Sequence, residues 1–168
     1  RRAHSATHVL HHALQKHVGS HAHRWRAKVD ADELRFDFTN MQALEDEQLA
    51  QIVAEVNARI TAAEPIRADI LPLAKAREQG AMMLFGEKYP DPVRMISMGA
   101  FSRELCGGTH LENTQDIGSF EIIAELAVSA GTRRIIALTG PKAQEHLAEE
   151  SAAVTKAAQI LGVDQSVI

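Results

Sequence analysis

Two pairs of potential metal ligands, far apart along the chain, most constrain how these 168 residues can fold. His4 and His8 lie near the beginning, and Cys106 and His110 lie much further along, each pair separated by three residues. Residues four apart share one face of a helix, so the two N-terminal imidazoles are expected to project together. If all four side chains hold one ion, the N-terminal helix must pack directly against the segment around Cys106.

The types of ligand indicate zinc. One thiolate with imidazoles is the sulfur and nitrogen set that zinc accepts, whereas magnesium and calcium prefer oxygen. The segment Cys106-Gly107-Gly108-Thr109-His110 suits a tight turn, because glycine tolerates positive φ and close backbone approach. A simpler interpretation is a buried cysteine beside an incidental histidine. His11 and His12 lie near the same helix face and are alternative ligands.

The role of such a metal stays open at this point. Four protein ligands are typical of a closed, structural zinc site, while a catalytic site keeps one position free. Either one of the four ligands steps aside, or the metal organises a pocket and chemistry occurs beside it. The stretch His4-Ser5-Ala6-Thr7-His8 lacks the glutamate of the His-Glu-x-x-His metalloprotease motif, which argues against peptide hydrolysis by that route.

Composition narrows the class of protein. A hydrophobic content of 45% supports a buried core, and the single cysteine excludes an internal disulfide, which fits a reducing, cytoplasmic compartment. No apolar run reaches about 18 residues and no signal peptide is evident, so we expect no membrane partner. Net charge is −4, yet residues 1–29 contain six Lys or Arg and no acid. That segment either binds phosphate groups of a ligand or is a solvated basic face.

Hydrophobic periodicity predicts an α+β fold with a largely antiparallel sheet packed with helices, the first of which carries His4 and His8. Helices are expected over 3–18, 40–60, 74–79 and 141–161, and strands over 34–38, 66–73, 93–98, 102–106, 117–125 and 133–139. In the last helix Leu147, Val154 and Leu161 are seven residues apart, which makes it a candidate for self-association. Because the first residue is Arg1 rather than Met, we expect a fragment of a longer protein.

Five stretches, in order along the chain, resemble the editing domain of alanyl-tRNA synthetase. They are Arg2-Ala3-His4-Ser5-Ala6-Thr7-His8, Leu34-Arg35-Phe36-Asp37-Phe38, Ala81 to Tyr89, Ser102 to His110, and Gly131-Thr132-Arg133-Arg134-Ile135. The resemblance implies an editing domain over 1–140 and a helical segment over 141–168 that leads to the next domain. It also implies zinc as the cofactor, with the acceptor end of tRNA(Ala) and the rest of the synthetase chain as partners.

The implied activity is hydrolysis of serine or glycine wrongly esterified to tRNA(Ala), because a pocket built for alanine cannot strongly reject either. By resemblance His4, His8, Cys106 and His110 hold the zinc, and Thr7 helps to exclude alanine. A threonine hydroxyl left without a partner costs about 1–3 kcal/mol, which would favour serine. The plain alternative for Thr7 is a helix-surface threonine bonded to its own backbone. The backbone at Gly107 and Gly108 is expected to position water, and Arg133 and Arg134 to contact the tRNA.

One departure from the family pattern concerns Arg24-Trp25-Arg26-Ala27, where the family usually reads Gln-x-Gly-Ser. Arginine is a permanent cation and only a donor. Arg24 and Arg26 are therefore expected to grip a phosphate of the tRNA 3′ end while Trp25 stacks on a base. The alternative is that the sequence of this loop has diverged and that editing is weak or lost. The chain would then be a tRNA-binding module in which zinc has only a structural role. A free-standing trans-editing protein is the third hypothesis. Glu104 is the acid nearest the metal ligands in the sequence. It is either a general base or a structural group.

Overall fold

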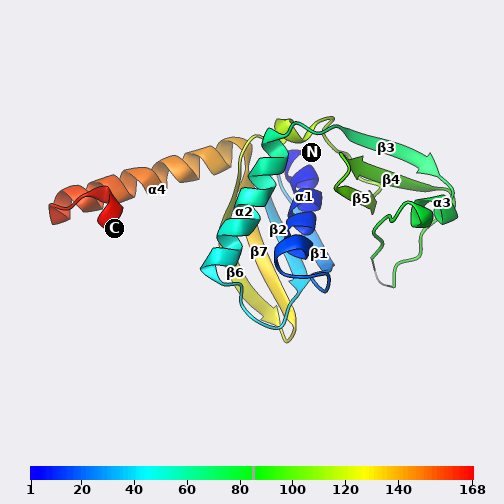
Figure 1. The fold of residues 1–168 in the computed structure, drawn as a ribbon, viewed down its shortest axis with the longest axis horizontal. Helices are drawn as coiled ribbons and strands as arrows, with labels where there is room; N and C mark the ends of the chain where they lie inside the picture. The colour runs from blue at the N-terminus through cyan, green and yellow to red at the C-terminus, as the bar shows by residue number, and fades with distance from the viewer. Residues whose placement is uncertain (85) are drawn as a thin grey trace.

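The computed structural model describes residues 1–84 and 86–168 as an α+β fold with two antiparallel sheets (Figure 1). One sheet has four strands in the order β1-β2-β7-β6, and the other has three in the order β3-β4-β5. The strands are β1 (Arg24–Val29), β2 (Glu33–Thr39), β3 (Ile66–Leu71), β4 (Val93–Met98), β5 (Ser102–Leu105), β6 (Phe120–Ser129) and β7 (Thr132–Thr139). The helices are α1 (Arg2–His17), α2 (Asp46–Thr61), α3 (Leu73–Glu78) and α4 (Gly140–Leu161), with short 3-10 turns η1 (Thr114–Ile117) and η2 (Gln165–Val167).

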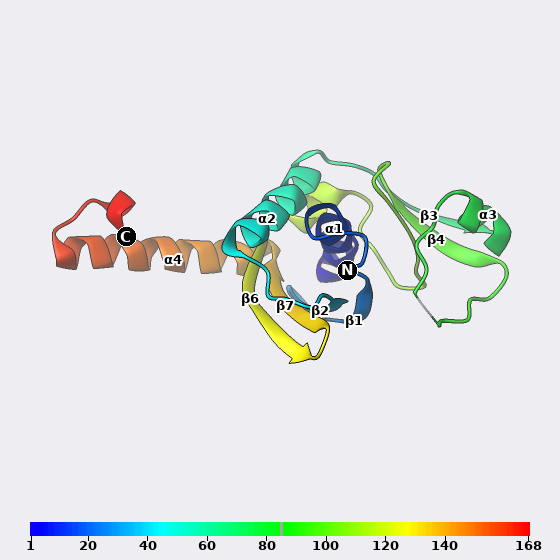
Figure 2. The ribbon, with the colours of Figure 1, turned by 60° about the horizontal axis from the view of Figure 1, so that its bottom comes forward.

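Helix α1 lies at the centre of the main core, enclosed by the four-stranded sheet and α2 (Figure 2). Its Leu10 and Leu14 are fully buried against the inner face of β2, where Leu34, Phe36 and Phe38 are fully buried as well. The alternation along β2 follows from the strand period of two, which sends every second side chain to the same face. Because α1 also contacts β5, the expected helix and the Cys106 segment are brought together.

The smaller sheet has its own apolar cluster, formed by Ala76, Val93, Met95 and Leu105. The chain leaves β5 at Leu105 and enters the 106–110 segment beside the start of α1. Arg94 on β4 holds this segment, since its Nη1 donates to the carbonyl of Cys106 at 2.9 Å and to that of Gly108 at 2.6 Å. Arg94 therefore anchors the turn to β4 through two of its backbone carbonyls.

Most predicted elements are present, but two of them begin later than expected and one strand was not predicted. Helix α2 begins at Asp46 rather than near 40, because Glu45 and Gln48 form a capping box that starts the helix there. The strand expected from 117 begins at Phe120, since Thr114–Ile117 forms the turn η1. Strand β1 was not predicted, because residues 24–28 were interpreted as a loop. That interpretation is wrong: the segment pairs antiparallel with β2, and its mostly exposed side chains give no apolar alternation.

Helix α4 extends away from the body of the molecule in both views (Figures 1 and 2). Pro141 occupies its first turn, and Gly162 ends it in the left-handed conformation at φ 66°. Leu147, Val154 and Leu161 are exposed on the single chain, so self-association through this helix stays a prediction. Among the described residues, no helix is both long enough and apolar enough to cross a bilayer.

Candidate metal centre and adjoining cleft

The four predicted ligands meet at one place. One ligand atom from each of His4, His8, Cys106 and His110 lies within 4.8 Å of all the others. The Cys106 sulfur is 3.5 Å from His4 Nε2 and 3.4 Å from His110 Nε2. Tetrahedral zinc with its usual nitrogen and sulfur bond lengths places such atoms roughly 3.5 Å apart. The spacing of the donor atoms therefore fits zinc.

Each of the three imidazoles has its Nδ1 next to another polar group, which leaves Nε2 directed at the metal centre. Such outer contacts orient histidine ligands in metal sites. The partners are the Thr109 carbonyl for His4 at 3.1 Å, a Glu104 carboxylate oxygen for His8 at 3.0 Å, and the Ser5 hydroxyl for His110 at 3.2 Å. The Nε2 of His8 is buried and has no hydrogen-bond partner among the described residues. A buried polar atom without a partner is costly, and coordination to zinc would satisfy it.

The electrostatics of the centre suit a cation. Burial raises the pKa of the Cys106 thiol, but hydrogen bonds from His110 and His4 outweigh burial and lower this pKa to about 3. The group is then a thiolate, which is the metal-binding form. Burial also lowers the pKa of His8, but the charges of Glu104 and Cys106 outweigh it and raise the pKa to about 9. Burial lowers the pKa of His110, which keeps that ring neutral and ready to bind.

Glu104 is a positioning group in this arrangement. Its side chain is almost fully buried, with one carboxylate oxygen 3.0 Å from His8 Nδ1 and the other 3.1 Å from His11 Nδ1. Burial alone would raise the pKa of Glu104, yet the charge on His8 and the hydrogen bond from His11 hold it well below its usual range. Both oxygens are engaged, so the geometry favours the structural role over the general base.

The two alternative histidine ligands are excluded by their contacts. His11 faces Glu104, and His12 lies 3.5 Å from Glu55 on α2, so neither belongs to the metal centre that the described residues form. A helix rises about 1.5 Å per residue, so position 11 lies about one turn further along α1 than position 8, while position 12 faces Glu55 on α2. The hypothesis that either histidine substitutes for a ligand is therefore wrong.

The two glycines of the turn differ in what they allow. A Cβ on Gly108 would lie 2.2 Å from the His4 ring, so only glycine lets the turn approach this ligand. A Cβ on Gly107 would meet nothing within 4 Å. Neither residue has a positive φ, so that part of the prediction is wrong. The predicted close approach is confirmed at Gly108 and not at Gly107.

Thr7 is buried within α1, between the two helical ligands. Its hydroxyl donates to the backbone carbonyl of His4 at 2.7 Å, which is the local bond that the plain alternative predicts. The proton of the hydroxyl is thus committed, while its oxygen can still accept a hydrogen bond. Thr7 does not line the cleft that adjoins the metal centre.

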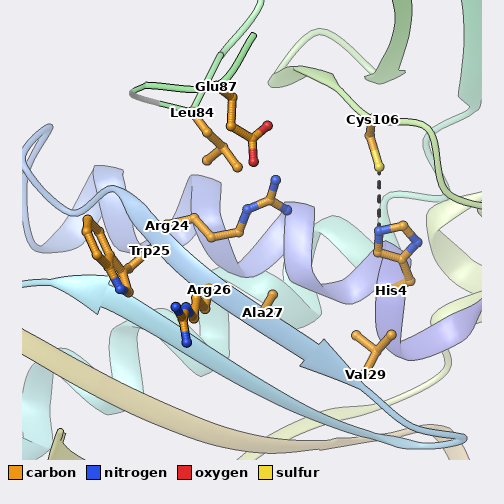
Figure 3. A pocket seen from close by; sticks show the side chains of 9 residues that line it. All are labelled: His4, Arg24, Trp25, Arg26, Ala27, Val29, Leu84, Glu87 and Cys106. Carbon is orange, nitrogen blue, oxygen red and sulfur yellow. Dashed lines mark hydrogen bonds between the residues drawn. The ribbon is translucent and has the colours of Figure 1, made fainter. Parts of the chain in front are cut away.

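That cleft consists of two adjoining cavities of about 450 and 600 Å³. They share five lining residues, Arg24, Trp25, Arg26, Leu84 and Glu87 (Figure 3). The first cavity reaches His4 and Cys106, and the second reaches His11. The unpredicted strand β1 therefore forms one wall of a cleft that ends at the metal centre.

The cationic and aromatic residues of β1 have different surroundings. Arg24 is largely buried, and its Nη1 lies 4.0 Å from a Glu104 oxygen, so it reaches the group that orients His8. In Figure 3 its guanidinium extends over α1 toward Glu87. Trp25, by contrast, is 64% exposed. An exposed indole beside a cleft is available to stack on a ligand.

Arg133 and Arg134, predicted to contact tRNA, lie on β7 in ion pairs. Arg133 donates to both carboxylate oxygens of Glu125 at 2.5 and 2.7 Å, and Arg134 to both of Asp37 at 2.7 and 2.9 Å. Neither arginine lines the two cavities. Both are engaged in stabilising the sheet.

Comparison with known proteins defines the class and then the family. Residues 93–136 match the model of the threonyl and alanyl tRNA synthetase second additional domain. The chain is 58% identical over 99% of its length to an alanine–tRNA ligase of Rhodopirellula baltica, and 47% identical over 98% to one of Cupriavidus necator. It spans only 18% and 19% of those two proteins. The chain belongs to the alanyl-tRNA synthetase family, as a segment that contains its editing-related second additional domain.

Proposed function

We propose that this segment hydrolyses the ester of tRNA(Ala) mischarged with serine or glycine, in a pocket that contains zinc. The observation that carries the proposal is the position of the four-ligand centre at the end of a cleft lined by Arg24, Trp25 and Arg26. The four potential metal ligands thus adjoin two arginines that can bind a phosphate and an indole that can stack on a nucleobase. The relatives are alanine–tRNA ligases, which supports tRNA(Ala) as the RNA that this segment binds.

Each group of residues at the site has a separate role in this proposal. His4, His8, Cys106 and His110 would hold the zinc, which when bound supplies a Lewis acid or a fixed structural centre. Arg24 and Arg26 bind backbone phosphate, and Trp25 stacks on a base of the acceptor end. The backbone at Gly108 contributes to the lowered pKa of the Cys106 thiol. In this proposal the backbone at Gly107 and Gly108 also positions the attacking water.

Discrimination against alanine rests on Thr7 in this proposal by family resemblance, although this buried side chain lies outside the lining of the two cavities. Because the Thr7 hydroxyl already donates to the His4 carbonyl, it can accept a hydrogen bond from the hydroxyl of a seryl group but cannot donate one. Alanine has no hydroxyl, so it forfeits this bond, which is worth about 1 kcal/mol net. Glycine also lacks the hydroxyl, and its acceptance depends on size alone.

The direct test compares deacylation of seryl-tRNA(Ala) and alanyl-tRNA(Ala). We expect faster loss of serine, and loss of this activity together with bound zinc in Cys106→Ala. The control for Cys106→Ala is Thr109→Ala, which changes another side chain of the same turn and keeps all four ligands. Equal rates on the two substrates, unaffected by removal of the metal, would contradict the proposal.

A second candidate is a zinc-stapled module that binds the acceptor end without hydrolysis. The closed set of four protein ligands and the contact of Arg24 with Glu104 favour it. It predicts tRNA binding with steep salt dependence in a protein that leaves seryl-tRNA intact. A free-standing trans-editing protein is the third candidate, and the length of the native gene decides between it and a ligase segment. In the ligase, we propose 1–140 as the editing domain and 141–168 as the helix to the next domain.

A further inference from the structure

A second cluster of potential metal ligands lies where α4 leaves the four-stranded sheet, away from the centre already described. Glu121 on β6 and the α4 residues His146 and Glu150 each place one ligand atom within 4.8 Å of the other two. His146 and Glu150 are four residues apart, so they share one face of the helix, and Glu121 meets them from the strand. The proposed hydrolysis uses none of these three side chains.

The surroundings of Glu121 call for a positive charge. Its side chain is only 13% exposed, and it lines a cavity of about 530 Å³ whose other lining residues are apolar except for Asn57. A carboxylate in apolar surroundings is costly unless an opposite charge accompanies it. Among residues 1–84 and 86–168, no lysine or arginine forms an ion pair with Glu121 or Glu150. The cluster is net negative whether the His146 ring is neutral or protonated, so it suits a cation.

The kinds of donor and their spacing indicate which cation fits. His146 Nδ1 lies 3.1 Å from Glu121 Oε2. Two ligand atoms bonded to one ion at about 2.1 Å, with an angle of about 90–110°, lie roughly 3.0–3.4 Å apart. An imidazole beside carboxylates suits a divalent first-row transition metal, whereas magnesium and calcium prefer oxygen alone. This set lacks sulfur, which distinguishes it from the centre at Cys106.

We infer that Glu121, His146 and Glu150 bind a second divalent transition metal ion, which fastens the first half of α4 to β6. The buried residues of α4 are Gly140, Ala143 and Ala158, and the helix extends away from the body of the molecule (Figure 1). An ion that holds Glu150 extends the attachment by about one turn beyond His146. It thereby fixes the direction in which α4 leaves the sheet. The inference goes beyond the proposed function and does not depend on it.

The test loads the four-ligand centre with one equivalent of zinc and then titrates the chain with cobalt(II). Cobalt bound to nitrogen and oxygen shows only d–d absorption bands, whereas cobalt bound to Cys106 would add a charge-transfer band from the thiolate. We expect one further equivalent of cobalt to bind, with d–d bands alone. Isothermal titration calorimetry gives its stoichiometry and affinity.

Matched variants assign the cobalt to the cluster. His146→Ala and Glu150→Gln each remove one ligand, and we expect at least about tenfold weaker cobalt binding, since loss of even an outer partner of a ligand costs that much. Glu149→Gln removes the same charge from the next position of α4, outside the cluster, and should change the affinity by less than about twofold. Circular dichroism and the zinc content of the first centre verify that each variant is folded.

A second measurement needs no variant. Amide hydrogen exchange over residues 144–154 should slow when cobalt binds the zinc-loaded chain, because the ion holds this part of α4 against β6. Exchange beyond residue 158 should stay unchanged, which provides the internal control.

Four results would overturn the inference. They are the absence of cobalt binding beyond the zinc centre, unchanged affinity in His146→Ala, equal weakening by Glu149→Gln and Glu150→Gln, and exchange over 144–154 that cobalt does not slow. Binding of magnesium in preference to cobalt would refute the role of the His146 ring as a ligand. If a variant fails to fold, the stoichiometry and the exchange of the unaltered chain still decide.

Discussion

Replacing Glu104 with glutamine tests whether an outer contact organises the metal centre. The carboxylate lies 3.0 Å from His8 Nδ1 and 3.1 Å from His11 Nδ1, and it is almost fully buried. A glutamine keeps the shape but removes the charge, and its amide group turns a donor toward one of two nitrogens that are themselves donors. His8 then loses the partner that orients its ring toward the metal.

The expected magnitude follows from what such outer contacts contribute. Loss of an outer partner of a metal-bound histidine typically weakens metal affinity about 10- to 100-fold, or roughly 1.4–2.7 kcal/mol. Because both oxygens of Glu104 are engaged, we expect the upper half of this range. Competition for zinc against a chromophoric chelator measures the change.

A matched control makes the result specific. Glu112→Gln removes one negative charge from an exposed position two residues beyond His110, and it should leave zinc affinity within about twofold, as most surface substitutions do. If Glu104→Gln binds zinc as tightly as Glu112→Gln, the orienting role of Glu104 is refuted. A folded Glu104→Gln chain, verified by circular dichroism, is required for the comparison.

Four further predictions concern the metal centre and the adjoining cleft. Gly108→Ala places a Cβ 2.2 Å from the His4 ring and should weaken zinc binding, whereas Gly107→Ala has open space and should not; chelator competition compares them. Because the pKa of His8 is raised from 6.5 to about 9, zinc binding at neutral pH should release its proton, which calorimetry in buffers of different ionisation enthalpy detects. In the metal-free protein the same shift stabilises the fold fully below pH 6.5, and this stabilisation is lost as the pH rises through about 9, as urea titrations at several pH values would show. Trp25→Ala should leave stability unchanged, since the side chain is 64% exposed, but should weaken tRNA binding by about 1–3 kcal/mol in a filter-binding assay. Equal zinc affinities of the two glycine variants, zinc binding without proton release, or tRNA binding unaffected by Trp25→Ala would contradict the respective prediction.

The ligands could be predicted because helix geometry is local. Four-residue spacing places His4 and His8 together whatever the rest of the chain does, and the ligand chemistry of Cys106 indicates a soft or borderline metal. Strand β1 could not be predicted in the same way. Its residues 24–29 are mostly exposed and cationic, and the strand exists because its backbone pairs with β2. Apolar periodicity carries no signal for a strand that is held by its backbone alone.

The roles of the polar groups around the ligands depended on partners that are distant in sequence. Glu104 has a neutral sequence context, and only the packing of β5 against α1 places its two oxygens between His8 and His11. The same packing buries His11 against Glu104, although His11 lies close to His8 on one helix. Sequence spacing alone made His11 a candidate ligand, but His11 lies about one turn further along α1 than His8, outside the group of four donors.

The sequence by itself determined the donor set of the metal centre, the helix that carries half of it, and the family to which the chain belongs. The donor set and the helix follow from residue chemistry and from the period of a helix, both of which are local, whereas the family follows from resemblance to known sequences. Only the tertiary structure decided which nitrogen of each imidazole faces the centre, and which wall of the cleft β1 forms. Those features depend on the polar neighbour of each Nδ1 atom and on sheet pairing, and both bring together residues that are far apart in the sequence.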